Sequence, residues 1–402
     1  MKLFPSRRAQ TTPASPIRKL YRYADAAKRK GICVFHLNIG QPDIPTPQEF
    51  FRMLKKYAKG VVPYAPSSGF PEVIDAWRTY YRHLGIRLSA QDISITTGGS
   101  EAIYFALLAV ADPGDEIVVL EPVYTSYVIY AKMFGIKLVP VTLNIRDGFH
   151  LPSHKTLVNA ITPRTRAIVI CNPSNPTGTV FTKREIDIVA GIAKARGLFI
   201  IADETYREIV FTKKKAVSFL SLAKVRDNVI LIDSASKRFN MCGARIGCMV
   251  SRNKSIMASV LKFSQGRLSS PFLEQLAVIP LLRNSGKFTR HLIREYRSRR
   301  DAVIRELSGI SGVSAYSPEG AFYVIAGLPV KDADHFCQWM LQTYQHNKET
   351  VMLAPAAGFY MTPKKGKNEV RIAYVLDAKK LSHAILILKR ALDRYPGIIQ
   401  TS

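Results

Sequence analysis

Two short stretches decide the fold of this chain: I-I-A-D-E-T-Y at residues 200–206 and I-D-S-A-S-K-R-F-N-M-C-G-A-R-I-G at residues 232–247. The first begins with apolar, β-branched residues and the second with the last residue of the apolar run 229–232; such runs are typical of buried strands, and both stretches then turn polar. The polar side chains that follow are those of Asp203, Tyr206, Ser234, Lys237 and Arg245. The two stretches therefore predict an acid and a phenol after one strand, and a hydroxyl, an amine and a guanidinium after another.

Strand and helix signals alternate around these stretches, from about residue 92 to residue 250. The alternation predicts an α/β fold, in which a mainly parallel sheet is covered by helices on both faces. Ligands of such sheets bind beyond the carboxyl ends of the strands, where Asp203 and Lys237 are expected. The predicted strands are 116–120, 137–142, 167–171, 198–202, 229–233 and 246–250, and the predicted helices are 99–110 and 183–196.

The remainder of the chain predicts a second, smaller domain. Leu, Arg and Glu recur at helical spacing over residues 272–307, which predicts a long helical stretch. Further on, a helix near 332–344 and a terminal helix from Asp377 alternate with short strand signals. We expect a large domain over residues 46–310 and an α+β small domain formed by residues 311–402 together with an N-terminal arm, residues 1–45.

The polar residues of the first two stretches suit one cofactor, pyridoxal phosphate (PLP). A carboxylate such as Asp203 can keep the pyridine nitrogen protonated, which makes the ring a better electron sink. Lys237 can form a Schiff base with the aldehyde, and Arg245 with Ser234 can hold the phosphate. The segment T-T-G-G-S-E-A at 96–102 adds a helix N-terminus, where free backbone N–H groups form an anion site.

The order of these motifs, together with N-P-S-N-P-T-G at 172–178 and N-E-V-R-I-A-Y at 368–374, resembles the class I aminotransferases of PLP fold type I. The likeness runs over about residues 13–395. It is to the subgroup of prokaryotic aspartate aminotransferases, which also holds aromatic, kynurenine and branched-chain enzymes. The resemblance implies a PLP-dependent transferase fold, amino-group transfer through a Lys237 Schiff base, and a homodimer with shared active sites.

The resemblance also implies roles for individual residues. Asp203 and Tyr206 join Lys237 as catalytic residues, and a neighbouring cation such as Arg245 is expected to lower the pKa of Lys237. Arg371 is expected to grip the substrate α-carboxylate with its planar fork. The remaining implied contacts are Gly99, Ser100, Glu101, Tyr124, Asn175 and, from the second subunit, Tyr64 for the cofactor, and Gly40 and Asn175 for the substrate.

The sequence indicates the type of reaction more clearly than it indicates the side chain of the substrate. Thermophile-type aspartate enzymes of the subgroup often carry Lys where this chain has Ser100. We therefore hypothesise that Arg267, in S-Q-G-R-L-S-S-P at 264–271, reaches a partner subunit's pocket and binds the distal carboxylate; an ordinary interface arginine is the alternative. The expected substrates are L-aspartate and 2-oxoglutarate. Aromatic, kynurenine-like or branched-chain transamination and a PLP-dependent β-lyase remain alternatives.

Composition limits the other classes of function. The five cysteines are scattered and odd in number, as expected of free thiols in a reducing compartment, and neither they nor the eight histidines show metal-site spacing. We do not expect a metal, and no apolar run approaches the roughly 18 residues that span a bilayer. The first 31 residues are basic, as in a transit segment, but are interpreted as the start of an ordered arm, so a cytoplasmic location is expected.

The formal net charge of +28 raises the alternative of a PLP-fold regulator that binds nucleic acid. The lysines and arginines are, however, spread through the chain, and no nucleic-acid motif accompanies them. Such a regulator usually carries a separate DNA-binding domain, for which this chain leaves no room. We therefore expect small-molecule amino acids and 2-oxo acids as partners, with the positive charge steering anionic substrates.

Overall fold

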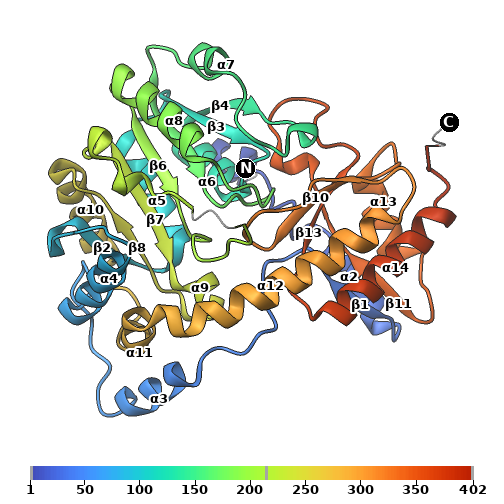
Figure 1. Ribbon diagram of the computed structural model, residues 1–402, viewed down its shortest axis with the longest axis horizontal. Coiled ribbons are helices and arrows are strands. Elements are labelled where there is room, and N and C mark those ends of the chain that lie inside the picture. The colour runs from blue at the N-terminus through green and yellow to red at the C-terminus, as the bar shows by residue number, and fades with distance from the viewer. Residues whose placement is uncertain (1–2, 213–215, 400–402) are drawn as a thin grey trace.

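The computed structural model describes residues 3–212 and 216–399. Its larger lobe is built on a seven-stranded sheet with the order β2-β8-β7-β6-β5-β3-β4 (Figure 1). Neighbouring strands are parallel except that β8 runs antiparallel to both β2 and β7. The predicted α/β fold with a mainly parallel sheet is confirmed. The strands are β2 Ile93–Thr96, β3 Glu116–Glu121, β4 Lys137–Thr142, β5 Thr165–Cys171, β6 Phe199–Asp203, β7 Val229–Ser234 and β8 Gly247–Val250.

Helices cover both faces of this sheet, because successive side chains of a strand point to opposite sides. Ile168 and Ile170 of β5 enter one hydrophobic core, whereas Ala167 and Val169 enter the other. The first core also takes apolar residues of α4 (Pro71–His83), α8 (Lys183–Arg196) and α11 (Phe272–Arg283). The second takes those of α5 (Gly98–Val110), α6 (Thr125–Phe134) and α10 (Lys254–Arg267).

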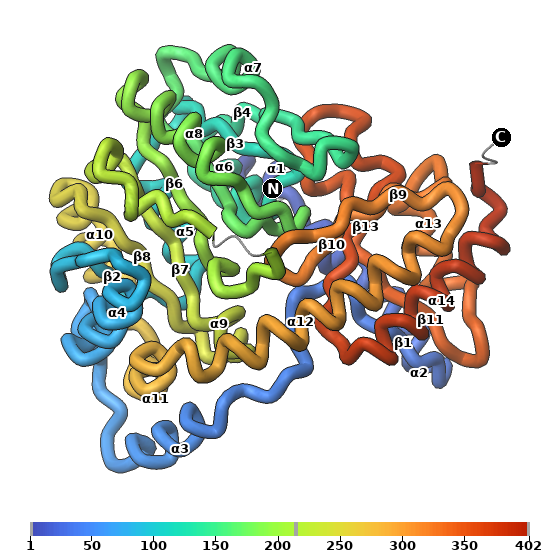
Figure 2. The backbone as a smooth tube through the Cα atoms, viewed as in Figure 1, coloured from blue at the N-terminus to red at the C-terminus, as the bar shows by residue number. Residues whose placement is uncertain are grey.

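The smaller lobe contains a four-stranded antiparallel sheet, β12-β13-β10-β9, and a parallel pair, β1-β11. Because β1 pairs with β11, the part of the N-terminal arm that contains β1 packs with this lobe, as Figure 2 shows, whereas α1 (Arg7–Thr11) contacts α6 of the larger lobe. The assignment of the whole arm to the smaller domain stays a prediction. The strands are β1 Cys33–His36, β9 Ser314–Ala315, β10 Tyr323–Gly327, β11 Glu349–Met352, β12 Ala354–Pro355 and β13 Glu369–Ala373. The helices that pack around them are α2 Tyr21–Arg29, α12 Ser285–Ser308, α13 Ala333–Gln342 and α14 Ala378–Arg394.

The long helical stretch predicted over residues 272–307 is present but divided, because α11 and α12 are separate helices that meet at Asn284. Asn284 has φ −122° and ψ 33°, outside the helical region. Pro280, within α11, has no N–H to donate to the helix ladder. Buried residues of α12 from Leu292 to Leu307 join the core of the smaller lobe. A domain boundary near residue 310, which stays a prediction, would assign them to the larger one.

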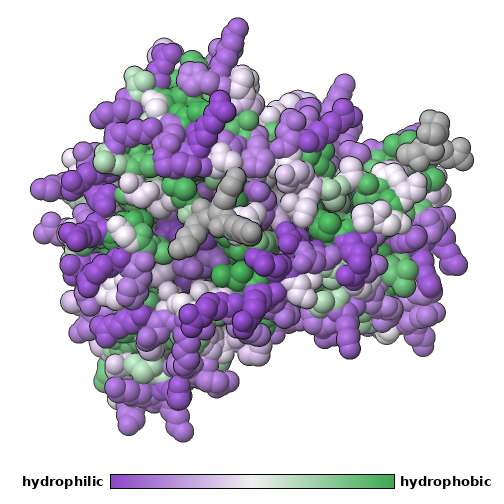
Figure 3. All heavy atoms as spheres, viewed as in Figure 1, coloured by the Kyte–Doolittle hydropathy of each residue, from purple (hydrophilic) through white to green (hydrophobic). Residues whose placement is uncertain are grey.

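The carboxyl ends of β6 and β7 face the smaller lobe (Figure 1). Hydrophilic side chains cover much of the face seen in Figure 3, with apolar patches between them. Within the described ranges, no helix is long and apolar enough to cross a membrane. The remaining helices are short and are α1 Arg7–Thr11, α3 Gln48–Tyr57, α7 His154–Asn159 and α9 Ala235–Arg238.

Candidate active site

A cavity of about 990 Å³ lies at the carboxyl ends of the central strands. Asp203 ends β6, Ser234 ends β7, and Asn175 and Tyr124 follow β5 and β3. The smaller lobe contributes Arg371 from β13. Of the residues predicted from the sequence, the structure brings these to the cavity: Gly40, Gly99, Ser100, Tyr124, Asn175, Asp203, Tyr206, Ser234, Lys237, Arg245 and Arg371.

Lys237 lies in α9, the single helical turn that follows β7. Its Nζ donates to the Gly40 carbonyl at 2.8 Å and to Cys242 Sγ at 3.4 Å. Gly40 packs closely here, since a Cβ at this position would lie 1.8 Å from the Tyr323 hydroxyl. Its predicted contact with the substrate carboxylate stays a prediction. The amine is therefore held inside the cavity, between a backbone carbonyl and a thiol.

The expected lowering of the Lys237 pKa is wrong. Burial by itself lowers the pKa of this ammonium, but the nearby Tyr323, Cys242 and Tyr124 outweigh burial, so the pKa lies above its ordinary value. Arg245, which was expected to lower it, turns its guanidinium toward backbone carbonyls, those of Cys242 at 3.0 Å and Thr97 at 3.2 Å.

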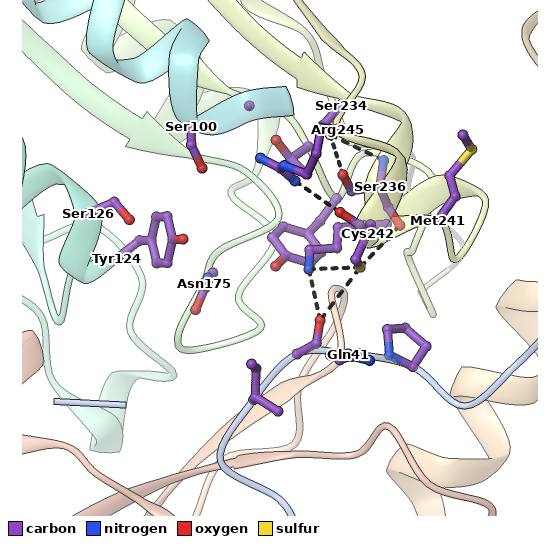
Figure 4. A pocket seen from close by; sticks show the side chains of 18 of the residues that line it. Gln41, Ser100, Tyr124, Ser126, Asn175, Ser234, Ser236, Met241, Cys242 and Arg245 are labelled. Atoms are coloured by element: carbon purple, nitrogen blue, oxygen red, sulfur yellow. Dashed lines mark hydrogen bonds between the residues drawn. The ribbon is translucent and has the colours of Figure 1, made fainter. Parts of the chain in front are cut away.

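One end of the cavity is built to receive an anion. Helix α5 begins at Gly98, and its 13 residues direct the positive end of the dipole and free N–H groups toward the cavity. The Arg245 guanidinium lies so close that a Cβ on Gly98 would be 2.4 Å from its Nη2. Figure 4 shows Ser234 and Ser236 beside Arg245, with Ser100 nearby. These donors fit a phosphate group.

Asp203 is a buried carboxylate with only modest hydrogen bonds. It accepts from the Thr205 N–H at 3.2 Å and from the Tyr127 hydroxyl at 3.4 Å. Burial raises the pKa of this carboxyl above its ordinary value. Because an ionised carboxylate is costly in such a place without a cationic partner, Asp203 fits a protonated ring nitrogen.

Arg371 supplies a second anion site on the opposite lobe. Its side chain is 1% exposed and donates to Asn175 Oδ1 at 3.0 Å and to the Asn38 carbonyl at 2.6 Å. Nε has no hydrogen-bond partner among the described residues, and no carboxylate is paired with the guanidinium there. Burial lowers the pKa of Arg371, although a guanidinium stays charged at neutral pH. A substrate carboxylate would compensate this buried charge.

Three predicted residues lie outside the cavity of this chain. Glu101 accepts from the Thr97 N–H at 2.8 Å and pairs with Arg267 at 3.1 Å, so it holds the start of α5 and does not line the cavity. Arg267 also donates to the Ser67 carbonyl. Tyr64 is 78% exposed, in the segment between α3 and α4. The roles predicted for Arg267 and Tyr64 in a second subunit stay predictions.

Comparison with known proteins places this geometry in a family. Residues 33–388 match the family model for aminotransferases of class I and II. The chain belongs to this family. It is therefore an enzyme of the transaminase type, and the resemblance read from its motifs is confirmed. The match begins at β1 and ends within α14, so it takes in both lobes and the cavity residues from Gly40 to Arg371.

Relatives match over nearly the whole chain. An aspartate aminotransferase of Pyrococcus horikoshii is 31% identical, covering 98% of each chain. An aspartate/prephenate aminotransferase of Thermus thermophilus is also 31% identical, covering 97% of this chain and 99% of its own. Among solved structures, the Thermus thermophilus aspartate aminotransferase with maleate has a TM-score of 0.89 at 28% identity, covering 97% and 100%. A Pyrococcus furiosus alanine aminotransferase has a TM-score of 0.89 at 27% identity with the same coverage. The fold-type I architecture is thereby confirmed.

Several cavity residues of this aminotransferase were missed from the sequence. The hydroxyls of Tyr323 and Tyr206 form a hydrogen bond at 3.0 Å. The centre of the Tyr323 ring lies 4.4 Å from the Arg371 guanidinium carbon. Arg18 of the N-terminal arm also lines the cavity. Tyr323 lies in the stretch G-A-F-Y-V-I at residues 320–325, which carried a strand signal only, and Arg18 is one basic residue among many. Neither offered a local pattern that separates a site residue from a surface or core residue.

Proposed function

We propose that this aminotransferase uses PLP and moves the amino group of L-aspartate to 2-oxoglutarate. The observation that carries the proposal is the position of the Lys237 amine in one cavity with three charged groups at separate places. These are the Arg245 anion site at the start of α5, the buried carboxylate of Asp203, and the buried guanidinium of Arg371.

The cavity residues divide according to the parts of PLP that they suit. Ser234, Arg245 and the N-terminus of α5 would hold the phosphate, and Asp203 would pair with the ring nitrogen. When bound, PLP supplies an aldehyde that exchanges amino groups and a ring that stores electrons. The remaining contacts we propose are Tyr124 against the ring face, Asn175 and Tyr206 at the phenolic oxygen, and Tyr64 of the partner subunit at the phosphate.

The chain's own groups bind and orient the amino acid. Arg371 would hold the α-carboxylate by two parallel hydrogen bonds, which fixes the direction of the Cα–H bond. We assign Lys237 Nζ as the base that removes the Cα proton. This amine lines the cavity and is held there by its hydrogen bond to the Gly40 carbonyl. Its raised pKa in the free chain must fall for it to act as a base near neutral pH.

Dicarboxylic substrates need a cation for the distal carboxylate. Arg18 lines the cavity of its own chain, whereas Arg267 is engaged with Glu101. Relatives at similar identity are named for aspartate, for prephenate and for alanine, so the names alone do not choose the substrate. The Thermus thermophilus structure with maleate, a dicarboxylate, supports a dicarboxylate ligand for that enzyme. We assign the distal carboxylate to Arg18, with Arg267 of the partner subunit as the competing candidate.

Two experiments test the proposal. Borohydride reduction of the PLP-loaded enzyme followed by peptide mapping should label Lys237, and labelling of another lysine would remove the basis of the assignment. A panel of single amino acids, followed by the change in visible absorbance of the bound cofactor, should give aspartate and glutamate the highest kcat/KM. If aromatic, kynurenine-like or branched amino acids are faster, the alternative substrate class is correct; pyruvate and ammonia release would indicate a β-lyase.

Variants then separate the two arginines. Arg18→Ala should raise KM for aspartate and leave alanine unchanged, whereas Arg267→Ala should do so only if that side chain serves a partner's pocket. We further propose that the enzyme is a cytoplasmic homodimer and does not bind nucleic acid. A gel-shift experiment with DNA at about 150 mM salt, where purely electrostatic binding is weakened, would contradict the last point by showing a complex.

A further inference from the structure

A buried ion pair lies next to the lysine on which the proposed function depends. Arg238 follows Lys237 and is 1% exposed. Its Nη2 donates to both carboxylate oxygens of Asp233, at 2.9 and 3.0 Å, and Asp233 is fully buried. Because Asp233 precedes Ser234, the pair joins the two ends of the segment 233–238. Ser234 and Lys237 lie between those ends.

Other elements fix both partners of this pair. The Asp233 carboxylate also accepts from the Ser234 N–H at 2.7 Å and from the Tyr81 hydroxyl at 2.9 Å. The Arg238 guanidinium carbon lies 4.1 Å from the centre of the Tyr80 ring, a cation–π contact. Tyr80 and Tyr81 belong to α4, so the ion pair ties the segment 233–238 to a long helix of the larger lobe.

The segment needs such support because its own secondary structure is minimal. Helix α9 has four residues, and one turn of helix is not stable by itself. Ser234 caps it by accepting from the Ser236 N–H at 3.1 Å. A buried charge pair adds a stiff constraint, since separating the partners would leave the Asp233 carboxylate without a cation and Arg238 with only Glu208, whose Oε1 lies 3.8 Å from Nε.

We propose that Arg238 and Asp233 form a positioning clamp that sets the location of Lys237 relative to Ser234. The inference rests on the proposed function, in which Ser234 holds the phosphate of the cofactor and Lys237 its aldehyde. Neither Arg238 nor Asp233 lines the cavity, so both act through their neighbours. A cofactor held at both ends transmits a shift of either residue directly to the reacting atoms.

The test compares Arg238→Gln with the unaltered enzyme by three measurements. These are the dissociation constant for PLP, the pH midpoint of the visible absorbance of the bound cofactor, and kcat and KM for the aspartate half-reaction. We expect PLP to bind about 10-fold more weakly, the midpoint to move, and kcat to fall by about 10- to 100-fold with KM within about twofold. A folded Arg238→Gln enzyme with unchanged PLP affinity and pH midpoint would overturn the inference.

Two further variants keep the test decisive if Arg238→Gln does not fold. Arg238→Lys retains the charge but not the paired fork, and Tyr81→Phe removes one hydrogen bond to Asp233. Both should shift the pH midpoint in the same direction as Arg238→Gln and by less. No shift in either would count against the clamp.

Glu185→Gln is the matched control, because it breaks a largely buried charged network of the same lobe in α8, away from segment 233–238. It should lower thermal stability and leave the pH midpoint unchanged. An equal shift in this variant would mean that general loosening of the lobe is responsible, and the inference would fail. Borohydride mapping of the unaltered enzyme separates this outcome from failure of the proposed function, which would leave Lys237 unlabelled.

Discussion

Arg371 is the residue whose environment most clearly calls for an anionic ligand, because its charge is buried with an amide and a carbonyl as partners. Replacing it by lysine keeps the charge and loses the bidentate fork. We expect kcat/KM for aspartate to fall about 100-fold, equivalent to about 2.7 kcal/mol. Steady-state kinetics on Arg371→Lys measures this effect.

Arg245→Lys provides the contrast, since this guanidinium belongs to the phosphate end of the cavity. It should weaken PLP binding, measured by titration of the apoenzyme, whereas Arg371→Lys should leave PLP affinity unchanged. Equal losses of PLP affinity in both variants would contradict the division of the cavity into a phosphate end and a carboxylate end.

At the scale of single residues, the sequence predicted which residues line the cavity better than it predicted their pKa values. Lys237 and Asp203 were found because polar residues directly after apolar strands are unusual enough to stand out, and Arg371 was found through the resemblance to the family. The pKa of Lys237 was wrong in direction, because it depends on Tyr323 and Cys242, and Tyr323 is distant in the chain. The Asp233–Arg238 pair was missed for a related reason: nothing local shows that the two side chains turn away from the cavity.

Helix α8 illustrates how one carboxylate can organise an element. Thr182 and Glu185 form a capping box, and Glu185 also accepts from the Leu151 N–H at 2.7 Å and His150 Nδ1 at 3.0 Å. Although burial opposes it, these hydrogen bonds lower the pKa of Glu185 from 4.5 to about 2. A lowered carboxyl pKa contributes stability that is complete above about pH 4.5 and is lost as the pH falls toward 2.

We therefore expect Glu185→Gln to lower the free energy of unfolding at pH 7 by about 2 kcal/mol, through lost charged hydrogen bonds. The loss should shrink between about pH 4.5 and pH 2, where the unaltered protein also gives up its carboxylate. Urea unfolding at a series of pH values measures this. A destabilisation that is constant over that range would show that the ionised form of Glu185 is not what stabilises α8.

The bounds of helices and strands were predictable where residues that start or end such elements occur in the sequence. The bounds of β4 and α8 agree with the sequence, because β-branched residues mark the strand and Gly197 ends the helix in a left-handed conformation with φ 64°. The break at Asn284 was not predicted, since apolar residues continue at helical spacing on both sides of it. Contacts between segments far apart in the chain could not be predicted from local patterns either: Arg371 donates to the carbonyl of Asn38, which is 333 positions away.

The charge of the whole molecule is the next level at which a test is informative. With a net charge of +28, the field around the enzyme should favour the approach of anions. We expect kcat/KM for 2-oxoglutarate, a dianion, to fall about threefold between about 20 and 200 mM NaCl, because salt shortens the range of that field. Alanine, which has no net charge, is the control. An equal salt dependence for both substrates would contradict steering.

Assembly can be tested through Tyr64, which is exposed beside Val61 and Val62 at 86% and 56% exposure. If the dimer shares its sites as proposed, Tyr64→Phe weakens PLP binding through the neighbouring subunit, and Lys237→Ala abolishes activity in its own. A mixed dimer of the two variants would then contain one complete site, with Lys237 from one chain and Tyr64 from the other. At a limiting PLP concentration, the mixed dimers formed by dissociating and re-forming the two variants should have half the activity of the unaltered dimer. If each chain used its own Tyr64, every site with Lys237 would retain the weakened PLP affinity, and mixing would restore nothing.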